Sequence, residues 1–266
     1  YVFLQGGEPT LRKDLPEVMT DLKKIGMDIT LITNGTRIKP ALIDSLKEVQ
    51  ASISISLDSL NRDHYKRIRG ADQLRLVLGG MERLKDYPYP KYTTCIVSAK
   101  NKDDVLDVVR YSRARGFIPV VGAYHWDIER YGKIDAALQY QKQVAAAVFE
   151  KVLAEDIVPK GYFSQYLQDN IDWLNDKPLK SCDAGRYSIA IDASGNVAPC
   201  LALKHAGNLL TSSLTEILSN FDREAIKSCS DKSSCNMMCS RVVGSNLRNP
   251  IMAIRTPQTI SADVTN

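Results

Sequence analysis

Two kinds of segment alternate along the first two thirds of the chain. Short apolar segments rich in Val, Ile and Thr each end in polar residues, as the buried strands of a parallel sheet do. The segments between them carry apolar residues at helical spacing, for example Leu15, Val18, Met19 and Leu22. This alternation of strand and helix predicts an α/β fold built from repeated βα units.

The same pattern gives the bounds of the βα units. We predict strands at residues 1–5, 28–33, 52–57, 92–98 and 117–124. We predict helices at residues 14–27, 40–49, 61–87 with a break at Gly70, 103–115, 135–155 and 163–174. Such a series is expected to form a partial (β/α)6 barrel of the TIM-like kind.

The composition changes after Asp176. Five of the six cysteines follow this point, and a hairpin at residues 187–197, a short helix at 214–220 and a polar tail are predicted there. The hairpin is expected to turn at Asp192-Ala-Ser-Gly195. We therefore divide the chain into a barrel domain at residues 1–176 and a small cysteine-rich domain at residues 177–266.

The bulk composition is that of an ordinary globular protein. Hydrophobic residues make up 44% and charged residues 25% of the 266 residues, which excludes disordered and fibrous classes. A formal net charge of +4 is too small to indicate nucleic acid, and no apolar run approaches the roughly 20 residues of a membrane span. We expect a cytoplasmic protein without a nucleic-acid or membrane partner. Because the chain starts at Tyr1 inside a predicted strand, we also expect further sequence upstream.

The turn after the first predicted strand reads Gly6-Gly7-Glu8-Pro9. Adjacent glycines let a backbone approach a ligand, and the following carboxylate can accept hydrogen bonds from an ammonium group. The tetrapeptide lies at the carboxyl end of a strand, where βα barrels hold their sites, and it indicates an amine-binding turn. The alternative interpretation is a plain strand-to-helix turn built from Gly and Pro.

Polar residues also follow the next three predicted strands. Ser and Asp at a strand end are common helix caps, so Ser56 and Asp58 have a structural interpretation beside a functional one. Arg69 can form a surface ion pair, and Asn101 can cap the helix after it. Spacing alone leaves both interpretations open for each of these residues.

Four motifs in this order resemble the core of radical S-adenosylmethionine (radical SAM) enzymes. The motifs are LQGGEPTL, LITNGT, ISLDS with HYKRIRG, and Asn101, and together they cover about residues 1 to 125. The resemblance implies that Glu8 binds the methionine amine of SAM, with Gly6 and Gly7 giving access. It further implies that the cofactor is bound with the help of Pro9, Asn34, Ser56, Asp58, Arg69 and Asn101.

The defining element of that family is a CxxxCxxC loop that holds a catalytic [4Fe-4S] cluster. Residues 1–266 contain no such motif. The resemblance implies that the loop, and the first strand of the barrel, lie upstream of Tyr1. The expected cofactors are therefore SAM and a catalytic [4Fe-4S] cluster whose ligands precede Tyr1.

The cysteines of the last third indicate a metal site. Disulfides are disfavoured in a cytoplasmic chain, and the two CxxC knuckles typical of zinc sites do not occur. Iron-sulfur ligation is the favoured interpretation, and zinc and free thiols are the alternatives. Cys95 lies apart on a predicted strand, where a small buried thiol is the ordinary interpretation. The candidate metal ligands are Cys182, Cys200, Cys229, Cys235 and Cys239.

This cysteine pattern resembles the SPASM extension, or its shorter form called twitch, which carries auxiliary clusters in many radical SAM enzymes. Cys182, a hairpin with Gly195, and Cys200 match its opening signature, and Cys229-x5-Cys235-x3-Cys239 matches part of its closing one. A cluster usually needs four thiolates, so five cysteines imply one auxiliary [4Fe-4S] cluster. The resemblance makes Cys182, Cys200 and Cys239 the surest ligands.

The combined resemblance implies an enzyme that cleaves SAM reductively to a 5'-deoxyadenosyl radical and abstracts hydrogen from a substrate. We expect a small-molecule natural-product or sugar-like substrate that undergoes dehydrogenation, epimerisation or deoxygenation. The electron would come from a flavodoxin or ferredoxin-type donor. The alternatives are an enzyme that modifies ribosomal peptides and a non-catalytic metal-binding relative.

Overall fold

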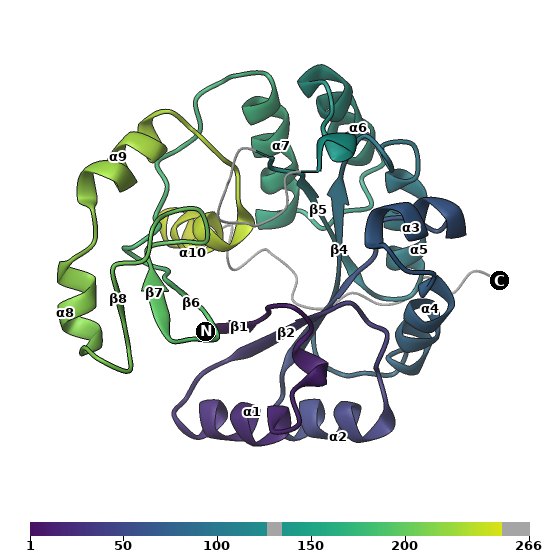
Figure 1. Ribbon diagram of the computed structural model, residues 1–266. Coiled ribbons are helices and arrows are strands. Elements are labelled where there is room, and N and C mark those ends of the chain that lie inside the picture. Colours follow the sequence, from purple (N-terminus) through teal and green to yellow (C-terminus); the bar gives the residue numbers. More distant parts are fainter. Residues whose placement is uncertain (127–134, 252–266) are drawn as a thin grey trace. The chain divides into compact units, whose positions relative to one another are not determined.

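The computed structural model describes residues 1–126 and 135–251, which form two compact units (Figure 1). Within these residues, unit 1 comprises Tyr1–Val121 and Lys151–Pro159, and unit 2 comprises the remainder. Residues 127–134 of the predicted barrel domain and residues 252–266 of the predicted tail lie outside the described residues. The contacts group residues 160–176 with the cysteine-rich part, and a domain boundary at residue 177 stays a prediction.

A five-stranded parallel sheet with the order β1-β2-β3-β4-β5 confirms the predicted α/β fold. All five strands occur where the apolar segments predicted them, and five α-helices follow them in the order of βα units. The strands are β1 (Val2–Leu4), β2 (Ile29–Thr33), β3 (Ser52–Ser56), β4 (Lys91–Val97) and β5 (Ile118–Ala123). The helices are α1 (Leu15–Lys24), α2 (Pro40–Glu48), α3 (Arg62–Arg69), α4 (Leu74–Arg83) and α5 (Val105–Ala114), and a 3-10 turn, η1 (Pro9–Leu11), precedes α1.

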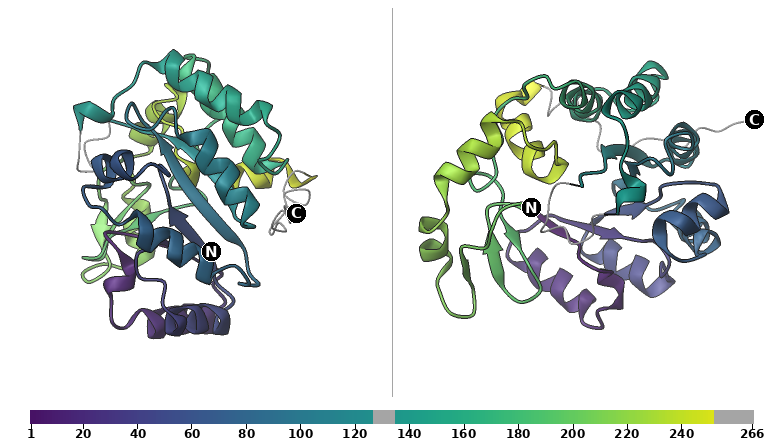
Figure 2. Two further views of the ribbon diagram at one scale, coloured as in Figure 1. Left: turned by 90° about the vertical axis from the view of Figure 1, so that its right-hand side faces the viewer. Right: turned by 45° about the horizontal axis from the view of Figure 1, so that its top comes forward.

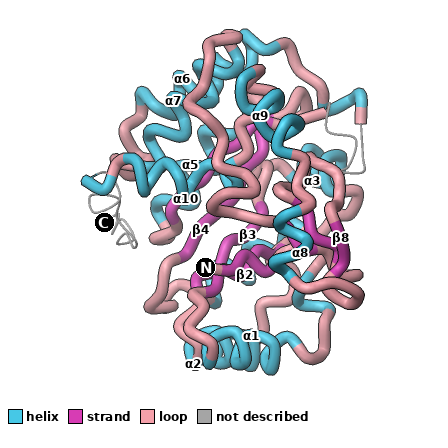
Figure 3. Tube along the Cα trace, turned by 90° about the vertical axis from the view of Figure 1, so that its left-hand side faces the viewer, coloured by secondary structure: helices cyan, strands magenta, loops and turns pink. Residues whose placement is uncertain are grey.

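The core of unit 1 lies between the sheet and the apolar stripes of its helices. Leu31 of β2 and Ile53 of β3 are neighbours in register, and both are fully buried. Met19 of α1 and Leu46 of α2 are also fully buried, and these two helices lie side by side (Figure 3). Figure 2 shows the same helices from two further directions. Burial of one helical stripe against a parallel sheet is the expected source of stability for βα units.

Two glycines fix the local course of the chain near the carboxyl ends of the strands. Gly70 adopts a left-handed conformation with φ of 76° and ends α3, which confirms the predicted break. Gly80 lies inside α4, where a Cβ atom would come within 2.6 Å of the carbonyl oxygen of Gly35. The absence of a side chain at Gly80 therefore lets α4 approach the turn after β2.

Unit 2 contains the remaining helices and a three-stranded sheet of order β6-β7-β8, in which both pairs are antiparallel. The predicted hairpin is confirmed, with Asp192 accepting hydrogen bonds from the amides of Ser194 and Asn196 across the turn. The elements are η3 (Ala136–Leu138), α6 (Lys142–Ala154), α7 (Tyr162–Leu174), β6 (Ala190–Ile191), β7 (Asn196–Ala198), β8 (Gly207–Asn208), α8 (Leu214–Ser219), α9 (Arg223–Asp231) and α10 (Met238–Arg248).

Two predictions about the helices were wrong. The helix predicted from residue 135 begins at Lys142, because Asp135 caps a separate 3-10 turn by accepting a hydrogen bond from the Ala137 amide. The segment predicted as a polar tail holds α9 and α10. Its helical period was hidden by Ser, Asn and Cys, and α10 is held by packing beside α7 and by an ion pair from Arg248 to Asp183. No helix within residues 1–126 and 135–251 is long and apolar enough to cross a bilayer.

Candidate cofactor and cluster sites

The carboxylate of Glu8 ties the turn after β1 to the end of β2. Its Oε1 atom accepts hydrogen bonds from the amide of Thr10 at 3.0 Å, the hydroxyl of Thr10 at 2.6 Å and the hydroxyl of Thr33 at 2.7 Å. Its Oε2 atom accepts the amide of Asn34 at 2.7 Å. A carboxylate can accept about four hydrogen bonds or more, and Oε2 keeps room for another donor. The predicted residues Glu8 and Asn34 are thus brought together at one strand edge.

The two glycines before Glu8 leave open space beside this edge. Both are exposed, and a Cβ atom at either position would meet nothing within 4 Å. Gly6 has a φ of 150°, a backbone conformation that side chains rarely allow. Pro9 then begins η1, and Glu8 serves as its N-cap. The main-chain atoms of Gly6 and Gly7 are therefore accessible to a ligand, which suits the amine of a bound amino acid.

Asp58 lies at the carboxyl end of β3 and is 3% exposed. Its Oδ1 atom accepts the amide of Ile96 at 2.9 Å, and its Oδ2 atom pairs with the guanidinium of Arg69 at 2.7 Å. The Arg69 side chain keeps 31% of its surface exposed. Arg69 therefore has a buried carboxylate on one side and solvent on the other, so that it can face a second anion.

Asn101 is 1% exposed and uses both atoms of its amide within the protein. Its oxygen accepts the amide and the hydroxyl of Ser98, at 2.8 Å and 2.9 Å, and its nitrogen donates to the carbonyls of Asp58 and Ile96, at 2.8 Å and 3.0 Å. This geometry fastens the end of β4 to the end of β3. Ser56, the last residue of β3, is half-buried beside Thr94 in register.

A second carboxylate network at this edge was missed from the sequence. Asp104 accepts a hydrogen bond from the Ser59 hydroxyl at 2.6 Å, and its carboxylate lies 2.7 Å from Nδ1 of His64. Asn61 caps α3 by accepting the amides of Asp63 and His64. The Ser-x-Asn sequence after Asp58 signals that cap, but its link to Asp104, 45 residues from Ser59, has no local signal.

The five cysteines of unit 2 come from four separate segments. Cys182 precedes β6, Cys200 follows β7, Cys229 lies on α9, and Cys235 and Cys239 lie before and within the first turn of α10. None of the chain's six cysteines forms a disulfide. Cys200 and Cys235 are buried, and the other three are half-buried. The folding of this unit thus gathers thiols that lie far apart in the sequence.

Several thiols of unit 2 lie near enough to one another to interact electrostatically. Cys200 interacts with Cys182 and Cys229, and Cys239 interacts with Cys200 and Cys182. A hydrogen bond from the Cys235 thiol lowers the pKa of Cys229 to about 6 and raises the pKa of Cys235. Burial raises the pKa of Cys200 and of Cys239. Loss of the protons from these buried thiols would need the positive charge that a metal supplies.

The donor set consists of thiols, which are the usual ligands of iron-sulfur clusters. Among the described residues, no group of three or more His, Cys, Asp or Glu side chains is arranged to hold one ion. A [4Fe-4S] cluster holds its thiolates around a larger body, so its ligands need not converge on one point. Soft thiolates without a histidine among them match this chemistry. Five cysteines exceed the four that one cluster needs.

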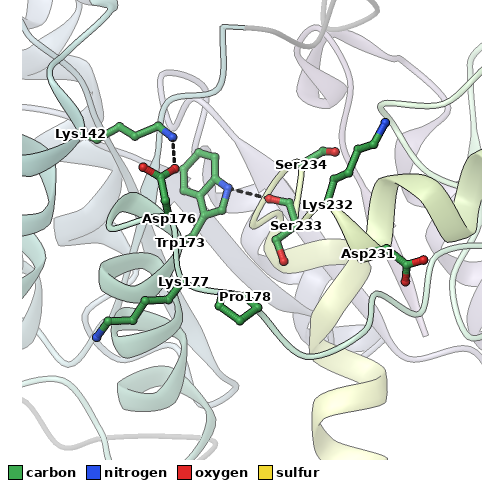
Figure 4. A pocket seen from close by; sticks show the side chains of 9 residues that line it. All are labelled: Lys142, Trp173, Asp176, Lys177, Pro178, Asp231, Lys232, Ser233 and Ser234. Atoms are coloured by element: carbon green, nitrogen blue, oxygen red, sulfur yellow. Dashed lines mark hydrogen bonds and ion pairs between the residues drawn. The ribbon is translucent and has the colours of Figure 1, made fainter.

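A separate cavity of about 280 Å³ in unit 2 borders the loop after α9 (Figure 4). The indole of Trp173 donates a hydrogen bond to the carbonyl of Ser233 at 3.0 Å, and Lys142 pairs with Asp176. Cations and anions both line the cavity, so its charge favours no ligand. Its residues are Lys142, Trp173, Asp176, Lys177, Pro178, Asp231, Lys232, Ser233 and Ser234.

Both parts of the chain match known families. Residues 1–118 match the Radical SAM superfamily, and residues 182–241 match SPASM, an iron-sulfur cluster-binding domain. The chain therefore belongs to the radical SAM enzyme superfamily and carries a C-terminal SPASM domain. The resemblance seen in the strand-end motifs and in the cysteine spacing is confirmed.

Curated relatives match parts of the chain. The sequence is 38% identical over 113 residues to a probable GTP 3',8-cyclase of Pyrococcus abyssi, a match covering 42% of this chain and 37% of that protein. A probable GTP 3',8-cyclase of Sulfurisphaera tokodaii is 29% identical over 212 residues, covering 75% of this chain and 65% of that protein. The chain thus spans less than two fifths of the length of the first of these relatives.

Solved structures share the fold. Native anSMEcpe with bound AdoMet and the Kp18Cys peptide has a TM-score of 0.66 at 19% identity, covering 90% of this chain and 73% of that one. Streptococcus suis SuiB bound to the precursor peptide SuiA has a TM-score of 0.64 at 15% identity, covering 82% and 53%. At these identities the likeness concerns the fold.

Proposed function

We propose that the protein cleaves SAM reductively and uses the resulting radical to abstract a hydrogen atom from a small-molecule substrate. The supporting observation is the gathering of five thiols from four segments in the SPASM domain of a chain whose barrel carries the strand-end motifs. The reaction consumes SAM, one electron and the substrate, whose hydrogen atom is transferred, and yields methionine, 5'-deoxyadenosine and a substrate radical. SAM and its cluster supply this one-electron chemistry when bound.

The residues of unit 1 would bind SAM at the carboxyl edge of the sheet. The accessible main chain of Gly6 and Gly7, with the spare capacity of Glu8 Oε2, would hold the methionine amine. Arg69 would pair with the methionine carboxylate through the exposed part of its guanidinium. Asp58 and Asn101 are too deeply buried for extensive contact and would act by fixing the strand ends, while Ser56, Asn34 and Pro9 would complete the edge.

The cysteines of unit 2 would hold one auxiliary [4Fe-4S] cluster. Cys182, Cys200 and Cys239 interact with one another and are the proposed core of the ligand set. Cys229 and Cys235 supply further thiols. The cysteines of the catalytic cluster would lie in a CxxxCxxC motif, which residues 1–266 do not contain, so the natural full-length protein is the one to test. A flavodoxin or ferredoxin-type protein would deliver the electron.

The substrate class is the finer part of the proposal. Relatives named for cyclising GTP support a small molecule, and five thiols support a single auxiliary cluster. A peptide substrate is the competing candidate. Two observations favour it: the match to the SPASM domain, and the fold relatives whose structures contain bound peptides. The assay must therefore offer both classes.

The test is release of 5'-deoxyadenosine by the full-length protein, purified without oxygen and reduced chemically. Nucleoside triphosphates, sugar derivatives and short peptides would be offered in separate reactions with SAM. We expect SAM-dependent release, accelerated by one of the small-molecule pools and not by peptides. Iron and sulfide for two clusters but no release in any reaction would contradict the enzymatic proposal. Acceleration by a peptide would overturn the assignment of the substrate class.

A further inference from the structure

Arg241 of α10 is a buried cation that forms no ion pair within the part of the chain that the structure describes. It is 7% exposed, and among residues 1–126 and 135–251 no Asp or Glu forms an ion pair with it. Its guanidinium donates to the carbonyls of Lys180 at 2.6 Å and Cys235 at 3.0 Å, while its Nε atom is buried without a hydrogen-bond partner. Burial of an uncompensated charge is costly, so such a residue implies a nearby anion.

The hydrogen bond from Arg241 to the carbonyl of Cys235 places its guanidinium beside the cysteine segment. Its charge acts on the thiols of Cys229 and Cys235, on Tyr162 and Tyr166 of α7, and on Asp169. Asp169 interacts with Arg241 through its charge, but the two side chains form no ion pair within the described residues. The thiols are thus the groups in reach of Arg241 that become anionic when they bind metal.

Arg248 of the same helix, in contrast, has its charge compensated by a buried carboxylate. Its Nη1 atom donates to both carboxylate oxygens of Asp183, at 2.8 Å and 2.7 Å, and Asp183 is 4% exposed. The fold therefore does supply a buried carboxylate where α10 needs one. No such carboxylate is paired with Arg241 within the described residues.

Asn236, the residue after Cys235, supplies a second unmatched group. It lies between Cys235 and Cys239 and is fully buried, and neither its amide oxygen nor its amide nitrogen has a hydrogen-bond partner. The main chain of Asn236 is fixed, because its main-chain N–H donates to Nε2 of His125 and its main-chain carbonyl accepts a hydrogen bond from the Tyr166 hydroxyl. A buried amide without partners is rare in folded proteins, so the Asn236 side chain is free to donate a hydrogen bond to a bound group.

We propose that Arg241 is the buried counter-ion of the auxiliary iron-sulfur cluster and that it raises the reduction potential of that cluster, with Asn236 as a second donor. This inference rests on the proposed function, which supplies the cluster. Four thiolates give a [4Fe-4S] cluster a net negative charge, and reduction adds one more. A fixed cation in a medium of low dielectric stabilises the reduced state more than the oxidised state, so the potential rises.

The experiment compares three variants of the full-length protein, loaded with iron and sulfide without oxygen. Arg241→Gln removes the charge, Arg241→Lys keeps it, and Arg223→Gln is the control. Arg223 also donates to two carbonyls, those of Gly185 and Leu218, but it is exposed. Metal content is measured first. A redox titration followed by electron paramagnetic resonance then gives the potential of the cluster whose signal does not respond to SAM.

We expect Arg241→Gln to lower the ratio of reduced to oxidised cluster at fixed potential at least tenfold, which is a shift of about 59 mV for one electron. Arg241→Lys should recover most of this shift, and Arg223→Gln should leave the potential unchanged. A loaded Arg241→Gln protein with the wild-type potential overturns the inference, and so does an equal shift in Arg223→Gln.

Two further outcomes are also decisive. If Arg241→Gln fails to hold iron, the Lys variant decides: a wild-type potential there supports the inference, and a lowered one overturns it. A wild-type protein that holds zinc, or iron for one cluster only, contradicts the auxiliary cluster itself. That failure is evident from the metal content before any potential is measured, so it is distinguishable from a failure of the role of Arg241.

Discussion

The two candidate sites differ in how far their polar groups are satisfied by the protein itself. At the strand edge of unit 1, Glu8, Asp58 and Asn101 each bind other groups of the protein through both polar atoms of their side chains. In unit 2, Arg241 and Asn236 keep buried atoms without hydrogen-bond partners, and burial disfavours the charged forms of Cys200 and Cys239. These contacts predict that the first site is organised before it binds a ligand and that the second is completed by one. The barrel should therefore fold without its cofactor, whereas the SPASM domain should depend on its cluster.

The largest expected effect is the loss of the auxiliary cluster on replacing Cys182, Cys200 and Cys239 together with alanine. We expect a loss of about four iron atoms per chain. Residues after 177 should become sensitive to limited proteolysis, while unit 1 keeps its fold because its core does not use these thiols. Iron analysis and proteolysis of the full-length protein check both points.

Cys95→Ala is the matched control for that triple variant. Cys95 is 1% exposed in unit 1, and its pKa is raised by burial, as expected for an inert structural thiol. The control should keep the iron content of the wild type. If the triple variant kept its iron, or if its barrel were digested as readily as its SPASM domain, the contrast between the two sites would be wrong.

The next effect in size is expected for Glu8→Gln. The carboxylate accepts four hydrogen bonds, and an amide group would place N–H donors against the amide of Asn34 or the hydroxyl of Thr33. We expect a loss of roughly 1.5 to 3 kcal/mol in stability without any ligand, and a loss of similar size in SAM binding. Thermal unfolding measures the loss of stability, and calorimetry measures the loss of SAM affinity.

Glu17→Gln is the control that tests whether the losses of stability and of SAM affinity are specific to the carboxylate of Glu8. Glu17 is an exposed residue of α1, and its replacement should change neither quantity. An unchanged affinity of Glu8→Gln for SAM would exclude Glu8 from amine binding and leave it as a residue that shapes the turn. An unchanged stability without SAM would contradict the view that this site is organised in advance.

The same contrast explains what the sequence could predict. Strands and most helices followed from local periodicity, and the predicted hairpin followed from Asp192 and Gly195. Helix α10 was missed because its position depends on distant partners, such as the pairing of Arg248 with Asp183. The strand-end residues could be found from their motifs, but their partners could not. Asp104 lies 40 residues from His64, and Arg241 lies 61 from Lys180.

The smallest predicted effect tests how tightly unit 1 holds its site. A Cβ atom at Gly80 would lie 2.6 Å from the Gly35 carbonyl and 3.0 Å from Cγ1 of Ile38, so Gly80→Ala must displace either α4 or the turn after β2. Such overpacking costs roughly 1 to 3 kcal/mol, against about 1 kcal/mol gained by replacing a helical glycine with alanine. We expect a net loss of about 1 kcal/mol, measured by denaturant unfolding. Gly79→Ala, whose Cβ would meet only the end of Arg83 at 3.8 Å, should be slightly more stable than wild type. Equal stability of the two variants would mean that the turn carrying Asn34 moves at little cost in free energy. The geometry of that turn would then be set by the bound ligand, which contradicts a site organised in advance.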